Sequence, residues 1–259
     1  MRATLTVLGS GTSMGVPTIG CDCAVCTSAD PHDRRTRPSI MVQWDGRTVL
    51  IDTTPDFREQ AIRENISRID AVLYTHGHAD HILGLDDVRP LSFPRITGGK
   101  KIPLYASDNT SRALRSVFRY IFDANYKYGG LAQVELLPLN GPLELFGAKF
   151  EPILVMHGDV AIEGYRFGRA AYLTDFSSVP EQSLAQLEGL EILFLDALRH
   201  HPHPTHSTVE NSLKIAERVR PKRTYFTHIS HDLPHEATNA ALPEGVQLSY
   251  DGLKLEFEL

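Results

Sequence analysis

The segment His76-Gly77-His78-Ala79-Asp80-His81 places four metal-binding side chains within six residues. It follows the apolar stretch Ala71–Tyr74, from which Thr75 alone separates it and which is typical of a buried β-strand. Imidazole and carboxylate groups are ligands that zinc, manganese and iron accept, and Gly77 permits a tight backbone path. A polar surface loop that happens to be rich in histidine is the plainer alternative, but the strand that leads into the segment argues against it. The segment therefore predicts a metal-binding loop at the end of a strand.

Other strand-like stretches also end in a possible ligand, namely His157, Asp175 and His228. Taken alone, each of these residues is more often structural than functional. Metal ligands need rigid and convergent placement, and strand ends along one edge of a sheet supply it. Their recurrence at strand ends predicts that they meet the 76–81 segment in one site.

Short apolar or β-branched runs alternate with helical or turn-rich segments along the chain. Strands are predicted at Thr4–Leu8, Ser39–Gln43, Thr48–Ile51, Ala71–Tyr74, Pro103–Tyr105, Lys149–Val155, Ala170–Leu173, Ile192–Phe194, Thr224–Phe226 and Lys254–Phe257. Helices are predicted at Phe57–Glu64, Leu85–Leu91, Thr110–Arg119, Glu181–Gln186 and Val209–Val219, with Thr208 as an N-cap. Some strands follow one another without a helix between them. This α/β (α+β) pattern favours stacked sheets flanked by helices over a simple doubly wound sheet.

The pattern His-x-His-x-Asp-His after a strand resembles the signature of the metallo-β-lactamase superfamily. His157, Asp175 and His228 follow in the order of that superfamily's later ligands, and Asp52 matches its early buried aspartate. The resemblance implies a four-layer αββα sandwich, with residues 1–259 forming a single hydrolase domain.

The resemblance also implies a dinuclear centre of zinc or manganese. One ion would be held by His76, His78 and His157, and the other by Asp80, His81 and His228, with Asp175 bridging them and Asp52 orienting the loop. Two divalent ions less two carboxylates and one hydroxide leave a charge of about +1, which suits a phosphodiester attacked by a metal-activated hydroxide. Asp175 also argues against a β-lactamase, because the matching ligand in the best-known members is cysteine.

The three cysteines of the chain, Cys21, Cys23 and Cys26, lie within six residues of one another. A tetrahedral zinc site needs a fourth ligand, and His231 is the best candidate. Together with the stretches 8–17 and 84–89, this pattern resembles the PhnP-type cyclic phosphodiesterases of the carbon–phosphorus lyase pathway. That resemblance implies one structural zinc that ties the N-terminal loop to the C-terminal active-site loop; three reduced, unliganded cysteines are the alternative.

A cluster of four histidines precedes the helix that is expected from Val209: His200, His201, His203 and His206. In the PhnP-like pattern a histidine of this segment contacts phosphate or donates a proton, and His206 is the best match. A histidine can be tuned to act as an acid near neutral pH. His200 and His201 are interpreted as solvated, and His203 is left undecided. The stretches Ser92–Ile102 and Tyr126-Lys127-Tyr128 are interpreted as surface loops rather than substrate contacts.

The composition is that of an ordinary globular protein, with 42% apolar and 22% charged residues among 259. The net charge of −6 predicts neither a broad nucleic-acid face nor binding to an anionic membrane. No apolar run approaches the roughly 20 residues that span a bilayer. These features predict a cytoplasmic protein with a small-molecule substrate, and superfamily relatives suggest a homodimer by analogy.

The predicted function is hydrolysis of a small phosphodiester, with a cyclic phosphate of ribose as one candidate. The same fold and metals leave three alternatives open. A transfer-RNA 3′-processing endonuclease would need a basic arm for RNA, a thioester or lactone hydrolase would use the metals to polarise a carbonyl, and a binding protein would keep the fold without catalysis. The residues do not identify the substrate, the choice of zinc or manganese, or a role in a phosphonate pathway.

Overall fold

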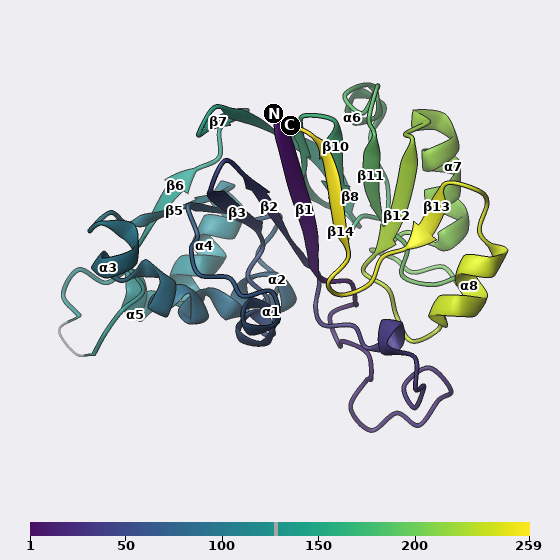
Figure 1. Ribbon diagram of the computed structural model, residues 1–259, viewed down its shortest axis with the longest axis horizontal. Coiled ribbons are helices and arrows are strands. Elements are labelled where there is room, and N and C mark those ends of the chain that lie inside the picture. Colours follow the sequence, from purple (N-terminus) through teal and green to yellow (C-terminus); the bar gives the residue numbers. More distant parts are fainter. Residues whose placement is uncertain (127–128) are drawn as a thin grey trace.

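Two seven-stranded sheets lie face to face in the computed structural model, which describes residues 1–126 and 129–259 (Figure 1). The first sheet has the order β14 (Lys254–Glu258), β1 (Arg2–Gly9), β2 (Ser39–Trp44), β3 (Arg47–Ile51), β4 (Ala71–Leu73), β5 (Ile102–Ala106) and β6 (Val134–Pro138). The second has the order β13 (Val246–Leu248), β12 (Arg223–Thr227), β11 (Ile192–Asp196), β10 (Ala170–Leu173), β9 (Val160–Phe167), β8 (Ala148–His157) and β7 (Leu143–Leu145).

Helices cover the outer face of each sheet (Figure 1). Those beside the first sheet are α1 (Phe57–Arg63), α2 (Ala79–Ile82), the 3-10 helix η2 (Leu83–Ser92), α3 (Pro94–Thr97), α4 (Asp108–Val117) and α5 (Arg119–Phe122). Those beside the second sheet are α6 (Glu181–Ala185), α7 (Val209–Val219) and α8 (His235–Ala241), while the short η1 (Pro31–Asp33) belongs to the N-terminal loop. The α/β class and the four-layer αββα sandwich are thus confirmed.

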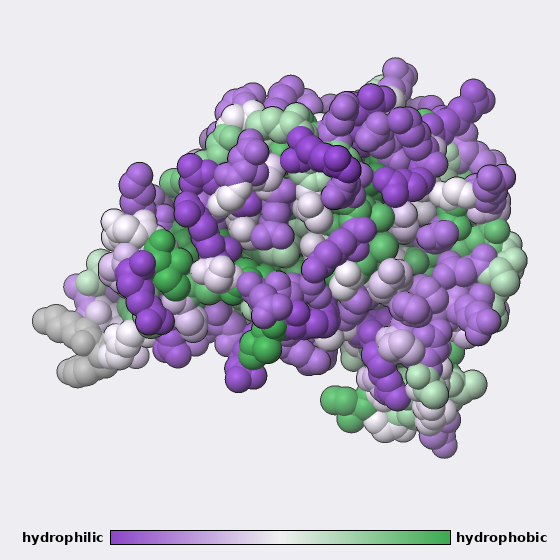
Figure 2. Space-filling model, viewed as in Figure 1, coloured by the Kyte–Doolittle hydropathy of each residue, from purple (hydrophilic) through white to green (hydrophobic). Residues whose placement is uncertain are grey.

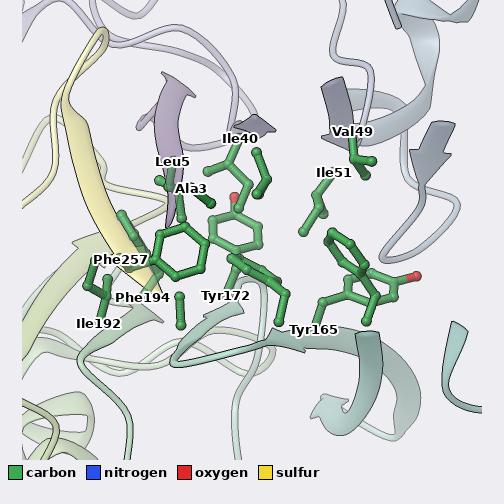
Figure 3. Packing of buried hydrophobic residues seen from close by; sticks show 14 of the residues in the cluster. Ala3, Leu5, Ile40, Val49, Ile51, Tyr165, Tyr172, Ile192, Phe194 and Phe257 are labelled. Carbon is green, nitrogen blue, oxygen red and sulfur yellow. The ribbon is translucent and has the colours of Figure 1, made fainter. Parts of the chain in front are cut away.

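The central core lies between the two sheets (Figure 3). Leu5, Ile40 and Ile51 extend from the first sheet toward Tyr172 and Phe194 of the second, and these five side chains are fully buried. Alternate residues of each strand point into this layer because strand side chains alternate between faces. Burial of this apolar surface holds the sheets together and makes their edges rigid supports.

Both sheets contain a parallel section whose strand ends share one edge. β3, β4 and β5 are parallel neighbours in the first sheet, as are β10, β11 and β12 in the second. Asp52, Asp175 and His228 follow three of these strands, and all have left-handed backbone conformations with φ of 67°, 57° and 57°. Non-glycine residues rarely adopt this conformation, and such strain is often found at functional sites.

Several predicted elements match the structure closely, whereas other elements of the structure were not predicted. The helix Val209–Val219 is present, and the Thr208 side chain accepts a hydrogen bond from the Asn211 N–H at 3.2 Å, as an N-cap should. The stretch Leu85–Leu91 forms a 3-10 rather than an α-helix, in keeping with Pro90 inside it. The prediction omits β6, β7, β9 and β13 and the short helices α2, α3, α5 and α8. Of the predicted surface segment 126–128, Lys127 and Tyr128 lie outside the described residues.

Candidate metal centre

One ring nitrogen from each of His76, His78 and His157, a possible metal ligand, lies within 4.8 Å of the other two. His76 and His78 belong to the loop after β4, whereas His157 ends β8 of the other sheet. The Nδ1 atom of His157 lies 2.5 Å from the backbone oxygen of Asp175, so this ring nitrogen donates and Nε2 is left as the ligand atom. The sandwich therefore brings together the first trio predicted from the sequence.

A second group consists of Asp80, His81, Asp175 and His228, all buried. His81 Nε2 lies 3.2 Å from Asp80 Oδ2 and 3.3 Å from Asp175 Oδ1. His228 Nε2 lies 3.2 Å from Asp175 Oδ2, and His76 Nε2 of the first trio is 3.8 Å from that same oxygen. Asp175 consequently lies between the two groups.

Although some of these distances are short, the polar atoms at the centre of these groups make no hydrogen bond of acceptable geometry with the described residues. They are His76 Nε2, His81 Nε2, His228 Nε2 and Asp80 Oδ2. A buried polar atom without a partner costs free energy, and such atoms are rare in native proteins. Convergent nitrogen and oxygen atoms of this kind fit divalent cations placed between them.

The electrostatics of the site point to the same requirement for positive charge. Burial opposes protonation of His81, but Asp175, Asp80 and Asp52 raise its pKa well above the usual range. His228 behaves similarly, because Asp175 overcomes burial and raises its pKa to about 10. Without another cation, the carboxylates would thus hold protons on imidazoles that metal binding requires to be neutral.

Asp52 holds the loop that carries the possible ligands through hydrogen bonds. Its carboxylate accepts hydrogen bonds from the Thr75 N–H and hydroxyl, both at 2.8 Å, and from His81 Nδ1 at 2.7 Å. The last of these bonds fixes the His81 ring so that Nε2 points to the other ligands. Asp52 occupies this position in a left-handed backbone conformation.

Asp196 is a site residue that the sequence prediction missed. It is fully buried at the end of β11, and its Oδ2 lies 2.8 Å from Nδ1 of His206. The His206 ring stacks on His228 at 4.5 Å and lies 5.0 Å from the His157 ring. Burial lowers the pKa of His206 to about 4, so the ring is neutral near neutral pH unless negative charge binds beside it. A signal for Asp196 was available, since the neighbouring strands β10 and β12 are also followed by possible ligands, Asp175 and His228.

The other histidines of this segment lie further out. His200 pairs with Glu210 at 2.7 Å with both side chains more than half exposed, and His201 is exposed. His203 is partly buried, and its ring centroid lies 4.9 Å from that of His206. His203 is therefore at the rim of the site, whereas His200 and His201 are in contact with solvent.

The cysteine cluster lies in the loop that projects beyond the sandwich (Figure 1). The Sγ atoms of Cys21, Cys23 and Cys26 lie 3.3, 3.7 and 3.3 Å from Nδ1 of His231. Ligands of a tetrahedral zinc are separated by about 3.5 Å when Zn–S and Zn–N bonds have their usual lengths. Burial raises the pKa of the Cys26 thiol to about 11, so a thiolate here needs a cation beside it. The four residues fit a closed zinc site.

Arg35 links the same loop to the C-terminal half of the chain. Its side chain is buried and pairs with Asp33 at 2.8 Å. It also donates hydrogen bonds to the backbone oxygens of Ser230 at 2.8 Å and Leu233 at 2.6 Å, on either side of His231. The N-terminal loop is therefore attached at two points to the segment that carries both His228 and His231.

Comparison with known proteins identifies the class to which this arrangement belongs. Residues 47–229 match the beta-lactamase superfamily domain. A solved structure described as a new diphosphatase from the PhnP family is 70% identical, with a TM-score of 0.96 over 100% of this chain and 98% of that chain. The chain thus belongs to the metallo-β-lactamase superfamily and, within it, to the PhnP family, as its motifs indicated.

Two further relatives extend the comparison. An octanoyltransferase of Porphyromonas gingivalis is 37% identical over 253 residues, which cover 96% of this chain but 50% of that protein, so the chain spans half the relative's length. Zinc-bound PqqB from Methylobacterium extorquens is 22% identical with a TM-score of 0.77, over 97% of this chain and 99% of that one, and shares the fold. The fold and family imply divalent metals and a metal-dependent hydrolase. No helix within the described residues is long and apolar enough to cross a membrane.

Proposed function

We propose that residues 1–259 act as one catalytic unit that hydrolyses a small phosphodiester with two divalent metal ions. The observation that carries the proposal is the convergence of unpartnered, buried imidazole and carboxylate atoms at the strand ends of both sheets. One ion would be held by His76, His78 and His157, the other by Asp80, His81 and His228, and Asp175 would contact both. When bound, such a pair supplies Lewis acidity for water activation and for charge on phosphoryl oxygens.

The charge of the site supports a phosphate substrate. Two carboxylates among the proposed ligands and one hydroxide reduce the charge of two divalent ions to about +1, which complements a singly charged phosphodiester. A phosphomonoester carries more negative charge near neutral pH and complements a site of about +1 less well. Cyclic ribose phosphates fall within this class, as do other small diesters.

His206 is proposed to carry the proton for the leaving oxygen. Asp196 holds Nδ1 of His206, which leaves Nε2 for the substrate. The negative charge of a bound phosphate opposes the effect of burial on this ring and favours its protonated form. Asp196 is therefore a positioning residue for His206, and Asp52 has the corresponding role for His81.

The cysteine cluster is proposed to hold one structural zinc. Its three sulfurs and one nitrogen would complete a tetrahedral shell and leave no open position for a substrate. Its effect would be to fix the N-terminal loop against the segment that contains His228. Zinc and manganese both remain candidates for the His/Asp centre, and a homodimer remains a prediction.

A second candidate is hydrolysis of a diphosphate linkage. It is favoured by the 70% identity to the PhnP-family structure described as a diphosphatase. The substituted phosphorus of such a diphosphate resembles that of a phosphodiester, since it carries two oxygen-linked groups, one of which leaves. The two activities require the same metals and differ in the leaving group, which is an alcohol in the first and a phosphate in the second.

The test is hydrolysis by metal-loaded protein of bis-p-nitrophenyl phosphate, p-nitrophenyl phosphate, a substituted diphosphate and a thioester. Preference for the diester supports the proposal, and preference for the diphosphate supports the second candidate. Thioester cleavage without phosphate-ester cleavage would overturn both, as would salt-dependent cleavage of transfer RNA alone. Absence of turnover on every ester would favour a binding protein.

A further inference from the structure

A basic cavity of about 410 Å³ lies away from the metal centre. Its walls include Arg47 at the start of β3, Arg68 before β4, and Lys100 and Lys101 before β5. Because β3, β4 and β5 are parallel and their carboxyl ends carry the metal loop, these cations lie at the opposite edge of the sheet. Lys100 and Lys101 thus cannot serve a substrate in the His/Asp centre.

Two of these cations are fixed by one buried carboxylate. Asp70 Oδ1 lies 3.1 Å from Arg47 Nη1 and 2.6 Å from Arg68 Nη2, and its side chain is 5% exposed. Its Oδ2 accepts from Arg68 Nε and from the Thr48 N–H, both at 3.0 Å. Both oxygens of the Asp70 carboxylate therefore accept hydrogen bonds, and the carboxylate holds both guanidinium groups at the cavity wall.

Lys100 and Lys101 differ from the two arginines in their ion pairing. Among the residues that the structure describes, neither Lys100 nor Lys101 has an ion-pair partner within 4.0 Å, and both are exposed. Gly98 and Gly99 precede them with φ of 66° and 84°, which turns the chain sharply after α3. Four cations against one carboxylate give the cavity a local charge of +3, in a chain whose net charge is −6.

Apart from Thr97, the remaining walls are apolar and include Ile69, Ile96 and Phe146. Phe146 lies in the β7–β8 turn of the second sheet, is 42% exposed, and has the Arg47 guanidinium 4.7 Å from its ring centroid. A cavity of this volume is in the range of small-molecule sites, which combine apolar walls with a few polar anchors. Arginine binds phosphate oxygens through a planar fork, and lysine binds them as a point charge.

From this arrangement we propose that the cavity is a second binding site, separate from the metal centre, for a small molecule with a diphosphate group attached to an apolar or aromatic moiety. The four cations bind the diphosphate, and Phe146 and Ile96 contact the attached group. The site is independent of the reaction carried out at the His/Asp centre.

The test is lysine acetylation of the metal-loaded protein, followed residue by residue by mass spectrometry, with ADP and inorganic diphosphate as probes. Slower acetylation of Lys100 and Lys101 with unchanged Lys149 and Lys222 is expected, at lower concentrations of ADP than of diphosphate. Arg68→Ala should reduce the affinity for ADP roughly tenfold, since it removes a charge-assisted contact. Arg218→Ala, which removes an exposed arginine paired with Glu181, is the matched control and should leave protection intact.

Equal protection of all four lysines, or no protection of Lys100 and Lys101, would overturn the proposal. Protection that survives Arg68→Ala unchanged would also overturn it, as would protection by a short RNA but not by either small probe. Diester hydrolysis by Arg68→Ala should equal that of the wild-type protein, which separates this site from the proposed activity.

Discussion

The His/Asp centre and the cysteine cluster share one loop, yet their chemistry differs. His228 belongs to the first and His231, three residues later, belongs to the second. The first draws its ligands from strand ends of both sheets and buries the carboxylates of Asp80 and Asp175. The second joins three thiols of one short loop to a single imidazole. The first arrangement suits a site that binds and activates, and the second suits a cross-link.

Removal of a carboxylate from the His/Asp centre should have the largest effect. Asp80→Ala takes away a charged ligand-type atom that contacts His81 and His228. Diester turnover should fall by roughly a thousandfold or more, because metal binding and charge stabilisation are lost together. Steady-state kinetics with metal analysis should show that one zinc equivalent remains at the cysteine cluster. Retention of more than a tenth of the wild-type turnover would contradict the assignment.

The next largest effect is expected from His206→Ala. Loss of a proton carrier should lower kcat roughly 100- to 10,000-fold, while the metal content stays unchanged. Asp196→Asn should produce a smaller loss, about 10- to 100-fold, because the ring remains but its tautomer and orientation are no longer fixed. Wild-type kcat in His206→Ala would exclude the role, and a larger loss in Asp196→Asn than in His206→Ala would exclude positioning through that ring.

Cys23→Ser should affect stability more than chemistry. The variant should lose about one equivalent of zinc, and its Tm should fall by roughly 5–10 °C, as a loss of about 2–3 kcal/mol produces in a chain of this size. Turnover per folded molecule should remain within about threefold of the wild type, because this cluster leaves no position for a substrate. Unchanged zinc content would eliminate the structural site.

The smallest predicted effect is on the pH dependence of the free energy of unfolding, and it comes from a histidine that packs beside the cysteine loop. The His235 ring is buried against His32, with centroids 4.6 Å apart, and burial lowers its pKa to about 4. A histidine whose pKa is lowered on folding binds its proton more readily when unfolded, so stability falls as the pH drops from about 6.5 toward 4. With allowance for partial solvent screening, the contribution of His235 to this decline should amount to about 1 kcal/mol, so stability should fall less steeply with pH in His235→Gln than in the wild type. Urea unfolding at several pH values with excess zinc would measure it, and equal slopes for both proteins would refute it.

Much of the fold could be predicted from the sequence because buried parallel strands are continuous apolar runs. The strands that carry Asp52, the 76–81 loop, Asp175 and His228 were all placed correctly. β9 was missed because Glu163, Gly164 and Arg166 interrupt its pattern. Gly164 is required there by packing, since a Cβ atom would lie 2.3 Å from the Leu173 side chain. Such contacts between strands are not visible in a single segment.

The candidate site was predictable to a similar degree and for a similar reason. The ligand-type residues form local motifs or end recognisable strands, so their grouping could be expected. Asp196 was missed because the strand was predicted to end at Phe194, and because its contact with His206, ten residues away in a loop, is not visible in the sequence. The hydrogen bonds from Arg35 to the backbone of Ser230 and Leu233 could not be predicted either, since they join residues almost 200 positions apart in the sequence.

The most direct test of the division between the two clusters is a chelator titration in which metal content, diester turnover and circular dichroism are followed together. Turnover should disappear as the His/Asp centre loses its metals, while about one equivalent of zinc and the native spectrum persist. Zinc in the closed cysteine cluster should leave last, and the fold should loosen with it. Turnover that persists until the final equivalent is removed would contradict this division.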